Sequence, residues 1–508
     1  MVQNILDYLS AASEKYPQKI AVIEEDRSVT YSELARNACS VGSFLLHVGC
    51  FRQPVGVYME KGIPALSAFF GIVSAGGFYC MLSTELPGAR LAQIQEVLQA
   101  KMILTTEGLK EKAAQIFPGC TVCTVEECLQ APAREEELRK IRRQMIDTDP
   151  LYVNFTSGST GVPKGIAVAH RSVVDFIGHF TELFGIGSDD IIANQAPFDF
   201  DVSVKDIYSA LKTGATLVIV PRKLFSAPSA LLDYLCDNRV TTMIWAVSAL
   251  CLITAFHGLD YRVPETVRKI LFSGEVMPYK HLRLWQEHLP DAVFVNLYGP
   301  TEITCNCTYH VLDNRRDYSS GIPIGQPFPN EDVFLLDEAF RKISLPGVAG
   351  QIAVRGTALA LGYYRLEDQN EKSFIRNPLN TSYPERIYLT GDLGQYDDRG
   401  DLLFCGRIDH QVKYLGHRIE LEEVEKCMSM IDGVERCFCT FENDRLKGYY
   451  VGSVDKGTLH SRMKETLPVY MIPGFLRRLE SMPMTKNGKI DRKQAVLAAE
   501  RRTDGGSN

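Results

Sequence analysis

A run of hydroxyl and glycine residues that ends in a lysine is the segment whose residue types predict chemistry most directly. Residues Thr156–Gly165 read Thr-Ser-Gly-Ser-Thr-Gly-Val-Pro-Lys-Gly and follow the largely apolar run Leu151–Phe155. Backbone amides in a glycine-rich turn and nearby hydroxyls are donors for phosphate oxygens, and Lys164 adds a cation. The Walker A order is absent, and alone such a segment is also compatible with a surface turn. The candidate phosphate ligands are Thr156, Ser157, Gly158, Ser159, Thr160 and Lys164.

The surrounding pattern predicts an α/β fold that would position this loop. Short β-branched runs alternate with segments of helical period up to about residue 330, which is typical of mostly parallel sheet. A β-rich stretch follows, and a smaller α/β unit begins near Gln411, with a helix predicted at Leu421–Met430. The strands expected before residue 330 are Ile20–Ile23, Pro54–Tyr58, Met102–Thr105, Ile191–Ala193, Thr216–Val220, Thr242–Trp245, Lys269–Phe272 and Ala292–Asn296, and those after it are Val333–Leu336, Gly350–Arg355, Arg386–Thr390 and Asp401–Phe404.

Length and charge narrow the class of protein. At 508 residues the chain is long enough for two or more domains, and its net charge of -7 argues against a nucleic-acid partner. The N-terminus lacks the basic start of a signal peptide, which favours a cytoplasmic protein. The uncharged segment Ile63–Leu82 has the length of a membrane span, but Pro64 and Gly76-Gly77 interrupt it. We therefore expect a buried helix, a tight turn and a buried strand at Phe78–Leu82, and no membrane contact.

The fourteen cysteines are scattered, and several lie in apolar runs. In a protein that is not secreted, such residues are more often small buried hydrophobes than disulfide partners. Cys120 and Cys123, with Cys128 nearby, have no second Cys or His pair at a suitable distance for a metal site. The cysteines therefore predict no metal centre.

Further motifs follow the loop in a fixed order, and together they identify a family. The set resembles the signatures of the adenylate-forming superfamily, which includes non-ribosomal peptide synthetase adenylation domains, acyl-CoA synthetases and firefly luciferase. The motifs lie at Val29–Leu34, Thr156–Gly165, Asn296–Glu302, Gly350–Tyr364, Tyr388–Asp392, Gly406–Lys413, Gly416–Leu421 and Asn487–Arg492.

The resemblance implies a domain organisation. Residues 1–408 are expected to form a large N-terminal adenylation core of two α/β subdomains and a β-rich subdomain. Residues 409–508 are expected to form a small mobile α+β domain, with a hinge near Asp409. Family members rotate this domain between adenylate formation and transfer of the acyl group to a thiol.

The resemblance also implies roles for individual residues in the use of ATP. Tyr298 would stack on adenine, Asp392 would accept hydrogen bonds from the ribose hydroxyls, and Glu302 would hold Mg²⁺. Thr301 and Arg407 belong to the same ATP-binding set. Lys489 would be the catalytic residue, because its compact cation suits the charge that develops between the substrate carboxylate and the α-phosphate.

The stretch Phe200–Asp206 resembles the amino-acid-activating subgroup, in which Asp201 would pair with the substrate ammonium. Lys205 is the outlier of the implied pocket, because an ammonium in an apolar pocket is costly unless an anion meets it. One reading is an acidic substrate side chain; the other is a small neutral substrate, with Lys205 extending to solvent. The implied pocket residues are Asp201, Val202, Lys205, Trp245, Leu271, Ser273, Leu297, Cys305 and Asn306.

The expected acceptor is a phosphopantetheinyl carrier protein in trans, because the chain ends soon after its last motif. The chain is also similar to the D-alanine–carrier-protein ligases, although Ser273 stands where that subgroup tends to have cysteine, and Lys205 is unexpected there. A ligase that uses free coenzyme A is the near alternative, and a luciferase-like oxygenase is a minor one. A non-catalytic nucleotide-binding protein is the distant one.

Overall fold

The computed structural model describes residues 2–158, 161–409, 411–414, 416–483, 490 and 492–500. The chain divides into two compact units. The first consists of Met1–Thr84, Leu98–Phe155 and Gly165–Ile408, and the second of Glu85–Val97, Thr156–Lys164 and Asp409–Asn508. The glycine-rich loop and a short segment near residue 90 therefore group with the C-terminal residues.

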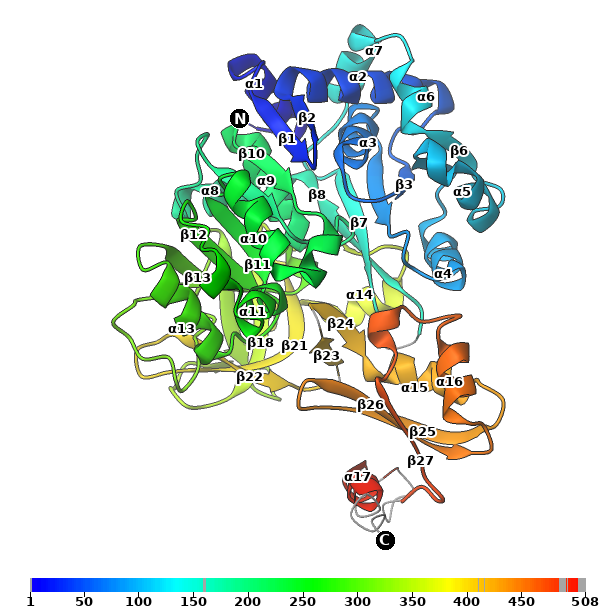
Figure 1. Cartoon of the computed structure of the whole chain (residues 1–508), viewed down its shortest axis with the longest axis vertical. Helices are drawn as coiled ribbons and strands as arrows, with labels where there is room; N and C mark the ends of the chain where they lie inside the picture. The colour runs from blue at the N-terminus through cyan, green and yellow to red at the C-terminus, as the bar shows by residue number, and fades with distance from the viewer. Residues whose placement is uncertain are drawn as a thin grey trace. The chain divides into compact units, whose positions relative to one another are not determined.

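A nine-stranded sheet in the first unit has the order β15-β14-β13-β12-β11-β9-β10-β1-β2. Its six central strands run parallel, and the strands at its two edges are antiparallel, as the alternation of strands and helices predicts. Connecting helices flank it (Figure 1). The strands are β1 (Ile20–Glu24), β2 (Arg27–Thr30), β9 (Ile191–Asn194), β10 (Thr216–Ile219), β11 (Thr242–Ala246), β12 (Lys269–Ser273), β13 (Val293–Tyr298), β14 (Thr308–Val311) and β15 (Gln326–Pro327), and the helices are α8 (His170–Leu183), α9 (Val202–Thr213), α10 (Pro228–Asp237), α11 (Val247–Ala255), α12 (Gly258–Tyr261) and α13 (Tyr279–His288).

A seven-stranded sheet, also largely parallel, has the order β19-β8-β7-β4-β3-β5-β6. The uncharged segment Ile63–Leu82 forms a buried helix, a turn with Gly76 at φ 76°, and a fully buried strand, which confirms its prediction. The strands are β3 (Pro54–Tyr58), β4 (Phe78–Leu82), β5 (Met102–Thr105), β6 (Thr121–Thr124), β7 (Pro150–Thr156), β8 (Lys164–Ala169) and β19 (Gly362–Tyr363), and the helices near them are α1 (Leu6–Lys15), α2 (Tyr31–Val48), α3 (Ile63–Ser74), α5 (Lys110–Ile116), α6 (Val125–Leu129) and α7 (Glu135–Arg142).

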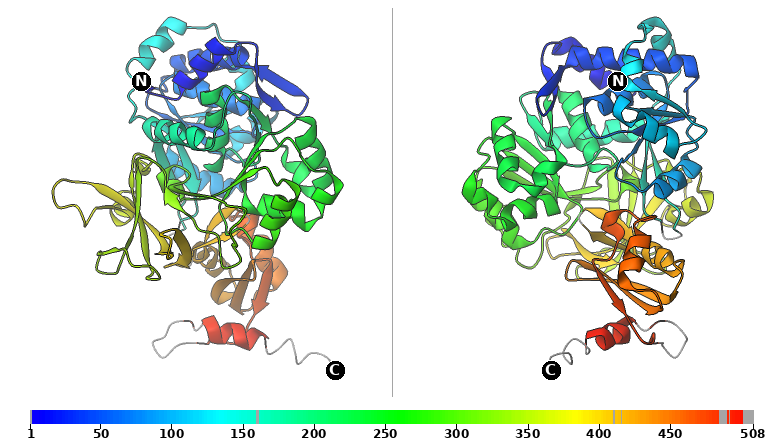
Figure 2. Two further views of the ribbon diagram at one scale, coloured as in Figure 1. Left: turned by 90° about the vertical axis from the view of Figure 1, so that its left-hand side faces the viewer. Right: turned by 45° about the vertical axis from the view of Figure 1, so that its right-hand side comes forward.

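An antiparallel six-stranded sheet forms the β-rich part of the first unit. It is drawn in yellow-green tones in the left-hand view of Figure 2, with few helices. The strands expected after residue 330 are confirmed here. They are β16 (Glu331–Leu336), β17 (Lys342–Ile343), β18 (Gly350–Gly356), β20 (Phe374–Arg376), β21 (Arg386–Tyr396) and β22 (Leu402–Arg407), with one helix, α14 (Glu367–Ser373).

The motif Val29–Leu34 has a structural role at the start of α2. Thr30 caps the helix by accepting a hydrogen bond from the Glu33 amide, and the Glu33 carboxylate accepts one from the Thr30 amide. This reciprocal capping box satisfies two amide groups that have no partner inside the helix. The motif therefore positions α2.

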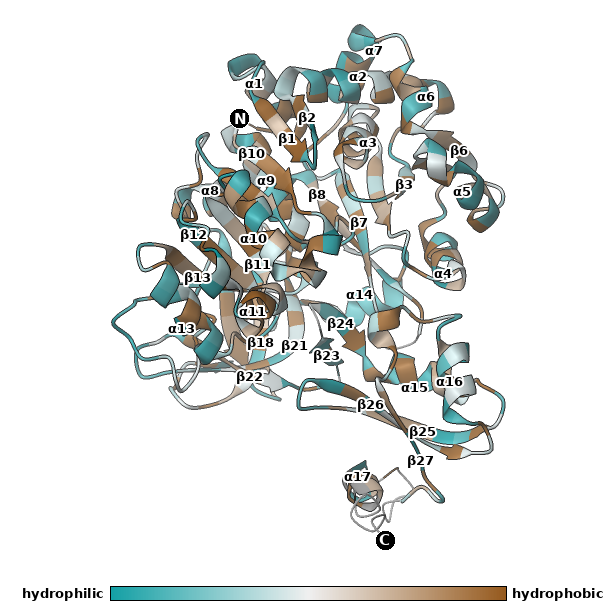
Figure 3. Cartoon of the chain, viewed as in Figure 1, coloured by the Kyte–Doolittle hydropathy of each residue, from teal (hydrophilic) through white to brown (hydrophobic). Residues whose placement is uncertain are grey.

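Separate apolar clusters form the core of the first unit. The hydropathy colouring separates the brown, apolar α11 from the teal, charged α7 (Figure 3). Within the described residues, no helix is both long enough and apolar enough to cross a membrane.

The second unit contains a three-stranded sheet, a two-stranded hairpin and several helices around their own apolar core. The helix predicted at Leu421–Met430 is confirmed, with an end that differs by one residue. The strands are β23 (Gln411–Tyr414), β24 (His417–Glu420), β25 (Val434–Glu442), β26 (Arg445–Gly452) and β27 (Phe475–Arg478), and the helices are α4 (Gly88–Leu98), α15 (Leu421–Ser429), α16 (Lys456–Met463) and α17 (Arg492–Glu500).

Candidate active site

Three residues predicted to bind ATP meet in the first unit. Asp392 and Arg407 are opposite each other in the register of β21 and β22, and they form an ion pair. Tyr298, at the end of β13, donates a hydrogen bond from its hydroxyl to Asp392 Oδ2 at 2.6 Å. Burial, and then the nearby Asp392 carboxylate, raise the pKa of Tyr298 well above its usual value. The 2% exposed Asp392 therefore has a protein donor on each oxygen.

Glu302 lies in a tight turn, η3 (Thr301–Ile303), directly after β13. Gly299 is required before the turn, because a Cβ there would lie 2.5 Å from Asn306 Cα. The Glu302 side chain is fully buried and accepts a hydrogen bond from the Tyr363 hydroxyl at 2.8 Å. After the turn, Thr304 and Cys305 adopt positive φ angles of 51° and 77°, a strained conformation for residues with a side chain.

This strained turn brings two of the predicted pocket residues to the start of α9. Cys305 Sγ donates to the backbone oxygen of Asp201 at 3.1 Å. Lys205 Nζ donates to Asn306 Oδ1 at 2.7 Å and to Ser273 Oγ at 3.3 Å. The structure therefore joins Asp201, Lys205, Ser273, Cys305 and Asn306 in one cluster.

Lys205 is the buried charge of this cluster. Its side chain is 0% exposed, so the expectation that it extends to solvent is wrong, while the size and charge of the substrate stay a prediction. Burial lowers the pKa of Lys205, while the neighbouring Cys305, Asp201 and Asp206 favour its charged form. In the described part of the chain, no carboxylate forms an ion pair with this ammonium. The Nδ2 group of Asn306 and the Ser273 hydroxyl likewise donate to no other described residue.

The remaining predicted pocket residues fall on two faces of the nine-stranded sheet. Leu271 and Leu297 belong to the same apolar cluster as Cys305. Trp245 belongs to the other cluster, and the centroid of its ring lies 5.6 Å from that of Phe225. Its indole N–H donates a hydrogen bond to the Ala193 oxygen at 2.9 Å. Because residues alternate along a strand, Trp245 faces away from Leu271 and Ser273. Val202, half-buried, is the first residue of α9.

A buried polar network beside this cluster was not predicted from the sequence. Lys61 Nζ donates to Asn194 Oδ1 at 3.0 Å, and Asn194 Nδ2 donates to Asp206 Oδ2 at 2.8 Å. Burial lowers the pKa of Lys61 to about 7 and raises that of Asp206 to about 8. The other oxygen of Asp206 has no hydrogen-bond partner among the described residues. The one signal in the sequence was a Lys-Asp pair inside an apolar helix.

Tyr152, on β7, is a second residue that the sequence did not single out. It is fully buried, and its hydroxyl has no hydrogen-bond partner within the described ranges. Burial, followed by the charges of Cys305 and Asp201, raises its pKa. It is a potential hydrogen-bond donor within the large apolar cluster that also contains Cys305.

The described part of the glycine-rich loop belongs to the second unit. Gly158 is required there, since a Cβ would lie 2.0 Å from the Val162 oxygen, and Gly161 has φ 79°. The Ser157 hydroxyl donates to the Arg418 oxygen at 2.8 Å. The Lys164 charge opposes the rise that burial causes in the pKa of Glu420. Thr156 Oγ1 is buried without a partner among the described residues.

Three predicted residues lie outside the described ranges: Ser159, Thr160 and the catalytic candidate Lys489. Asp409, the hinge candidate, is the first C-terminal residue of the second unit and accepts a hydrogen bond from the Gln411 amide at 3.2 Å.

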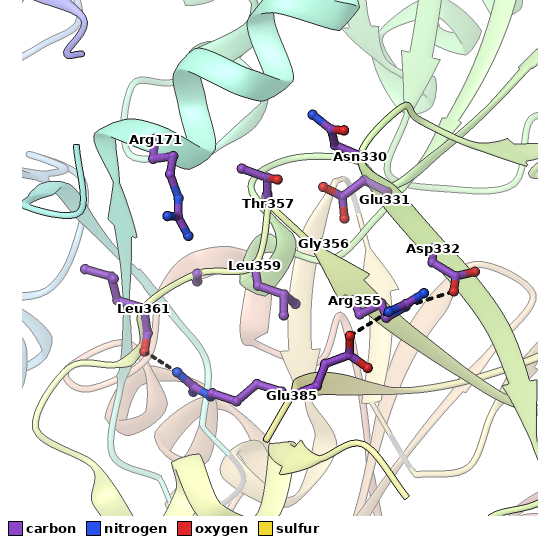
Figure 4. Close-up of a pocket in the computed structure, with 12 residues that line it drawn as sticks. Arg171, Asn330, Glu331, Asp332, Arg355, Gly356, Thr357, Leu359, Leu361 and Glu385 are labelled. Carbon is purple, nitrogen blue, oxygen red and sulfur yellow. Dashed lines mark hydrogen bonds and ion pairs between the residues drawn. The ribbon is translucent and has the colours of Figure 1, made fainter. Parts of the chain in front are cut away.

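A cavity of about 680 Å³ in the first unit contains none of the predicted residues in its lining. Arg355 forms ion pairs there with Asp332 at 2.9 Å and Glu385 at 2.5 Å, while Arg171 points into the opening from α8 (Figure 4). Charged side chains of the cavity wall thus pair with one another. The cavity is distinct from the Lys205 cluster.

Comparison with known proteins decides the family. Residues 9–364 match the model of the AMP-binding enzymes. This chain is an AMP-binding enzyme. Zwittermicin A synthase ZmaJ from Bacillus cereus is 31% identical over 95% of the chain and 92% of its own length. Tyrocidine synthase 1 from Brevibacillus parabrevis is also 31% identical over 95% of the chain, which spans only 44% of that synthase.

Solved structures agree with this assignment. Holo-PA1221, described as a non-ribosomal peptide synthetase protein containing adenylation and PCP domains, matches with a TM-score of 0.83 and 25% identity, over 97% of this chain and 84% of its own. The predicted fold class is confirmed. The AMP-binding enzyme is an adenylating ligase of the non-ribosomal peptide synthetase adenylation-domain type, and membership of the family implies that it uses ATP.

Proposed function

We propose that this enzyme activates an amino acid with an acidic side chain and transfers it to the phosphopantetheine thiol of a separate carrier protein. The observation that carries the proposal is the buried Lys205, which has two neutral acceptors and no ion-pair partner in the described part of the chain. Because an isolated buried charge is costly, a substrate carboxylate is the group that this ammonium lacks.

The chemistry of the cluster supports recognition at both ends of such a substrate. Asp201 is proposed to pair with the α-ammonium group. The Lys205 ammonium, the Asn306 amide and the Ser273 hydroxyl provide donors for a side-chain carboxylate. Leu271, Leu297 and Val202 are proposed to border the aliphatic part. We place Trp245 behind this pocket, as a support for the sheet.

The proposed reaction has two steps. A carboxylate oxygen of the amino acid attacks the α-phosphorus of ATP, the bond from that phosphorus to the bridging oxygen breaks, and pyrophosphate leaves. The carrier thiol then attacks the acyl carbon, loses its proton, and releases AMP. Residues 1–408 are proposed as the adenylation core and residues 409–508 as the mobile domain, with Asp409 as its hinge.

The residues that match the family motifs are assigned to these steps by proposal. The loop Thr156–Lys164, with Thr301, is proposed to bind the phosphates, and Lys489 to stabilise the charge at the α-phosphate. Tyr298 is proposed for the adenine, and Asp392 with Arg407 for the ribose. Both Asp392 oxygens keep lone pairs beyond their bonds to Tyr298 and Arg407, so they are able to accept the ribose hydroxyls.

Mg²⁺ is proposed to bind Glu302, where it would neutralise charge on the ATP phosphates. Among the described residues no group of three or more His, Cys, Asp or Glu is arranged to hold a metal ion. One carboxylate nevertheless fits Mg²⁺, because this ion keeps several waters and takes further ligands from the nucleotide phosphates. The reaction is proposed to take place in the cytoplasm.

Amino-acid-dependent exchange of labelled pyrophosphate into ATP tests the first step. We expect aspartate or glutamate to give the highest kcat/KM, and Lys205→Ala to abolish that preference. A highest rate with D-alanine or another small neutral amino acid, or acidic activity unchanged in Lys205→Ala, would overturn the proposed substrate class.

The second step is tested by the choice of acceptor. The enzyme is incubated with ATP and its preferred amino acid, and with either a phosphopantetheinylated carrier protein or free coenzyme A. A thioester on the carrier alone supports the proposal. Efficient formation of an acyl-coenzyme A favours the coenzyme A ligase instead.

A further inference from the structure

A buried carboxylate is bound to the described part of the phosphate loop, within the second unit. Glu423, in the first turn of α15, accepts a hydrogen bond from the Gly158 amide at 3.1 Å through Oε2. Its other oxygen pairs with Arg90 of α4 at 2.5 Å. The two side chains are 3% and 6% exposed. One loop amide is therefore bound to an anion of the protein itself.

Neighbouring contacts show that this face of the C-terminal residues lies along the loop. The Ser157 hydroxyl donates to the Arg418 oxygen, at the strand directly before α15. A Cβ built on Gly161 would lie 3.2 Å from the Lys426 ammonium, one turn along α15. Three points of the loop thus contact the β24–α15 region, and the Glu423 carboxylate is the anionic contact among them.

We propose that Glu423 is a positioning residue that competes with pyrophosphate for the phosphate loop. The inference rests on the proposed function, in which this loop binds the ATP phosphates. A carboxylate and a phosphate oxygen use the same Gly158 N–H, and two anions at this distance repel each other. Glu423 must leave when the phosphates bind, and it returns when pyrophosphate departs.

The buried Arg90 favours the state in which Glu423 occupies the loop. Departure of Glu423 leaves the guanidinium without its carboxylate partner, which disfavours the phosphate-bound state unless a phosphate oxygen replaces it. Return of Glu423 restores the pair and closes the Gly158 amide to pyrophosphate. Pyrophosphate binds only while the carboxylate is away from the loop. The apparent affinity for pyrophosphate is therefore reduced in proportion to the fraction of molecules in which the Gly158 amide is open.

The variant Glu423→Gln tests this role, because glutamine keeps the size and the acceptor oxygen but loses the charge. Binding of inorganic pyrophosphate to the full chain is measured by calorimetry, and its inhibition constant is measured in the adenylation assay. We expect both constants to fall about fivefold to tenfold, the difference between a charge-assisted and a neutral hydrogen bond.

Two further variants separate this effect from a loss of structure. The double variant Arg90→Gln/Glu423→Gln removes the whole pair and therefore leaves no buried, unpaired guanidinium. It should bind pyrophosphate at least fivefold more tightly than the wild type. Glu425→Gln, on the same helix, removes a carboxylate that pairs with Arg492 at 2.8 Å and forms no hydrogen bond or ion pair with the described residues of the loop. Its constants should equal those of the wild type.

Unchanged pyrophosphate binding in both Glu423→Gln and the double variant would overturn the proposal, as would an equal change in Glu425→Gln. The proposed function fails in a different way: the wild type would then exchange no pyrophosphate with any amino acid. Calorimetry with pyrophosphate reports on Glu423 in either case.

Discussion

Two buried charges of the first unit, Asp392 and Lys205, differ in how the protein balances them. Asp392 has the Arg407 guanidinium on one oxygen and the Tyr298 hydroxyl on the other. Among the described residues, Lys205 donates hydrogen bonds to the neutral oxygens of Asn306 and Ser273 and forms no ion pair. Both side chains are buried, so water does not solvate either charge. The contrast indicates that the protein itself neutralises the charge of Asp392, whereas the charge of Lys205 is to be neutralised by a bound anion.

Replacement of the balanced charge should have the largest effect. In Asp392→Asn the half-buried Arg407 loses its ion pair with the carboxylate and keeps its hydrogen bond to the Thr390 oxygen. We expect the unfolding free energy to fall by about 3 kcal/mol, as when a buried pair is broken. We also expect pyrophosphate exchange to fall at least about 100-fold, since two proposed ribose-binding groups are disturbed. Urea unfolding and exchange rates measure the two effects.

Asp397→Asn is the matched control, because Asp397 pairs with Arg316 at 3.1 Å near the end of the same sheet and has no proposed role in catalysis. Its exchange rate should stay within twofold of the wild type. An equal loss of activity in the two variants would mean that damage to the sheet, and not the Asp392 site, explains the result.

Removal of the unbalanced charge should have the opposite effect on stability. In Lys205→Met, relief of the buried ammonium offsets the loss of its two hydrogen bonds, so the unfolding free energy should stay within about 1 kcal/mol of the wild type or rise. The kcat/KM for an acidic substrate should fall about 10-fold to 100-fold. A loss of stability as large as that of Asp392→Asn would show that Lys205 is already balanced by the protein, and the comparison would fail.

The pH dependence of activity sharpens the same point. Burial lowers the pKa of Lys205 below its ordinary value of 10.5, and recognition of a carboxylate needs the protonated form. The kcat/KM for an acidic substrate should therefore fall with rising pH at a pH below 10.5, and Lys205→Met should lack this limb. The charged form is the destabilised one, so the contribution of Lys205 to stability falls as the pH drops from 10.5 through its folded pKa.

The smallest effect is expected for Ser273→Ala. The hydroxyl accepts the longer of the two Lys205 hydrogen bonds, at 3.3 Å, so its loss should lower the kcat/KM for an acidic substrate about twofold to fivefold. Steady-state kinetics are the measurement. A larger effect than that of Lys205→Met would assign substrate recognition to the hydroxyl in place of the ammonium.

Much of the fold could be predicted because local patterns determined it. The β-branched runs became strands within one or two residues at most ends, and Thr30 with Glu33 gave α2 its capping box. The grouping of the phosphate loop with Arg90 and Glu423 could not be predicted, since it depends on contacts between residues more than 60 positions apart along the chain.

The site was predicted as a set of residues but not as a set of contacts. The ion pair of Asp392 with Arg407 follows from the register of two antiparallel strands, which the sequence does not reveal. The side of the sheet that Trp245 faces depends on its pairing with Phe272 on the next strand. The link from Lys61 through Asn194 to Asp206 joins three distant segments, so only the finished fold displays it.

The most direct test of the unbalanced charge compares an acidic amino acid with its own amide. Aspartate and asparagine, and glutamate and glutamine, differ in charge and hardly in size, so the ratio of kcat/KM within each pair in pyrophosphate exchange isolates the contribution of the Lys205 ammonium. We expect the acid of the preferred length to be favoured over its amide at least about 10-fold in the wild type, and not in Lys205→Met. An amide that is activated as well as its acid, or a small neutral amino acid that exceeds both, would contradict it.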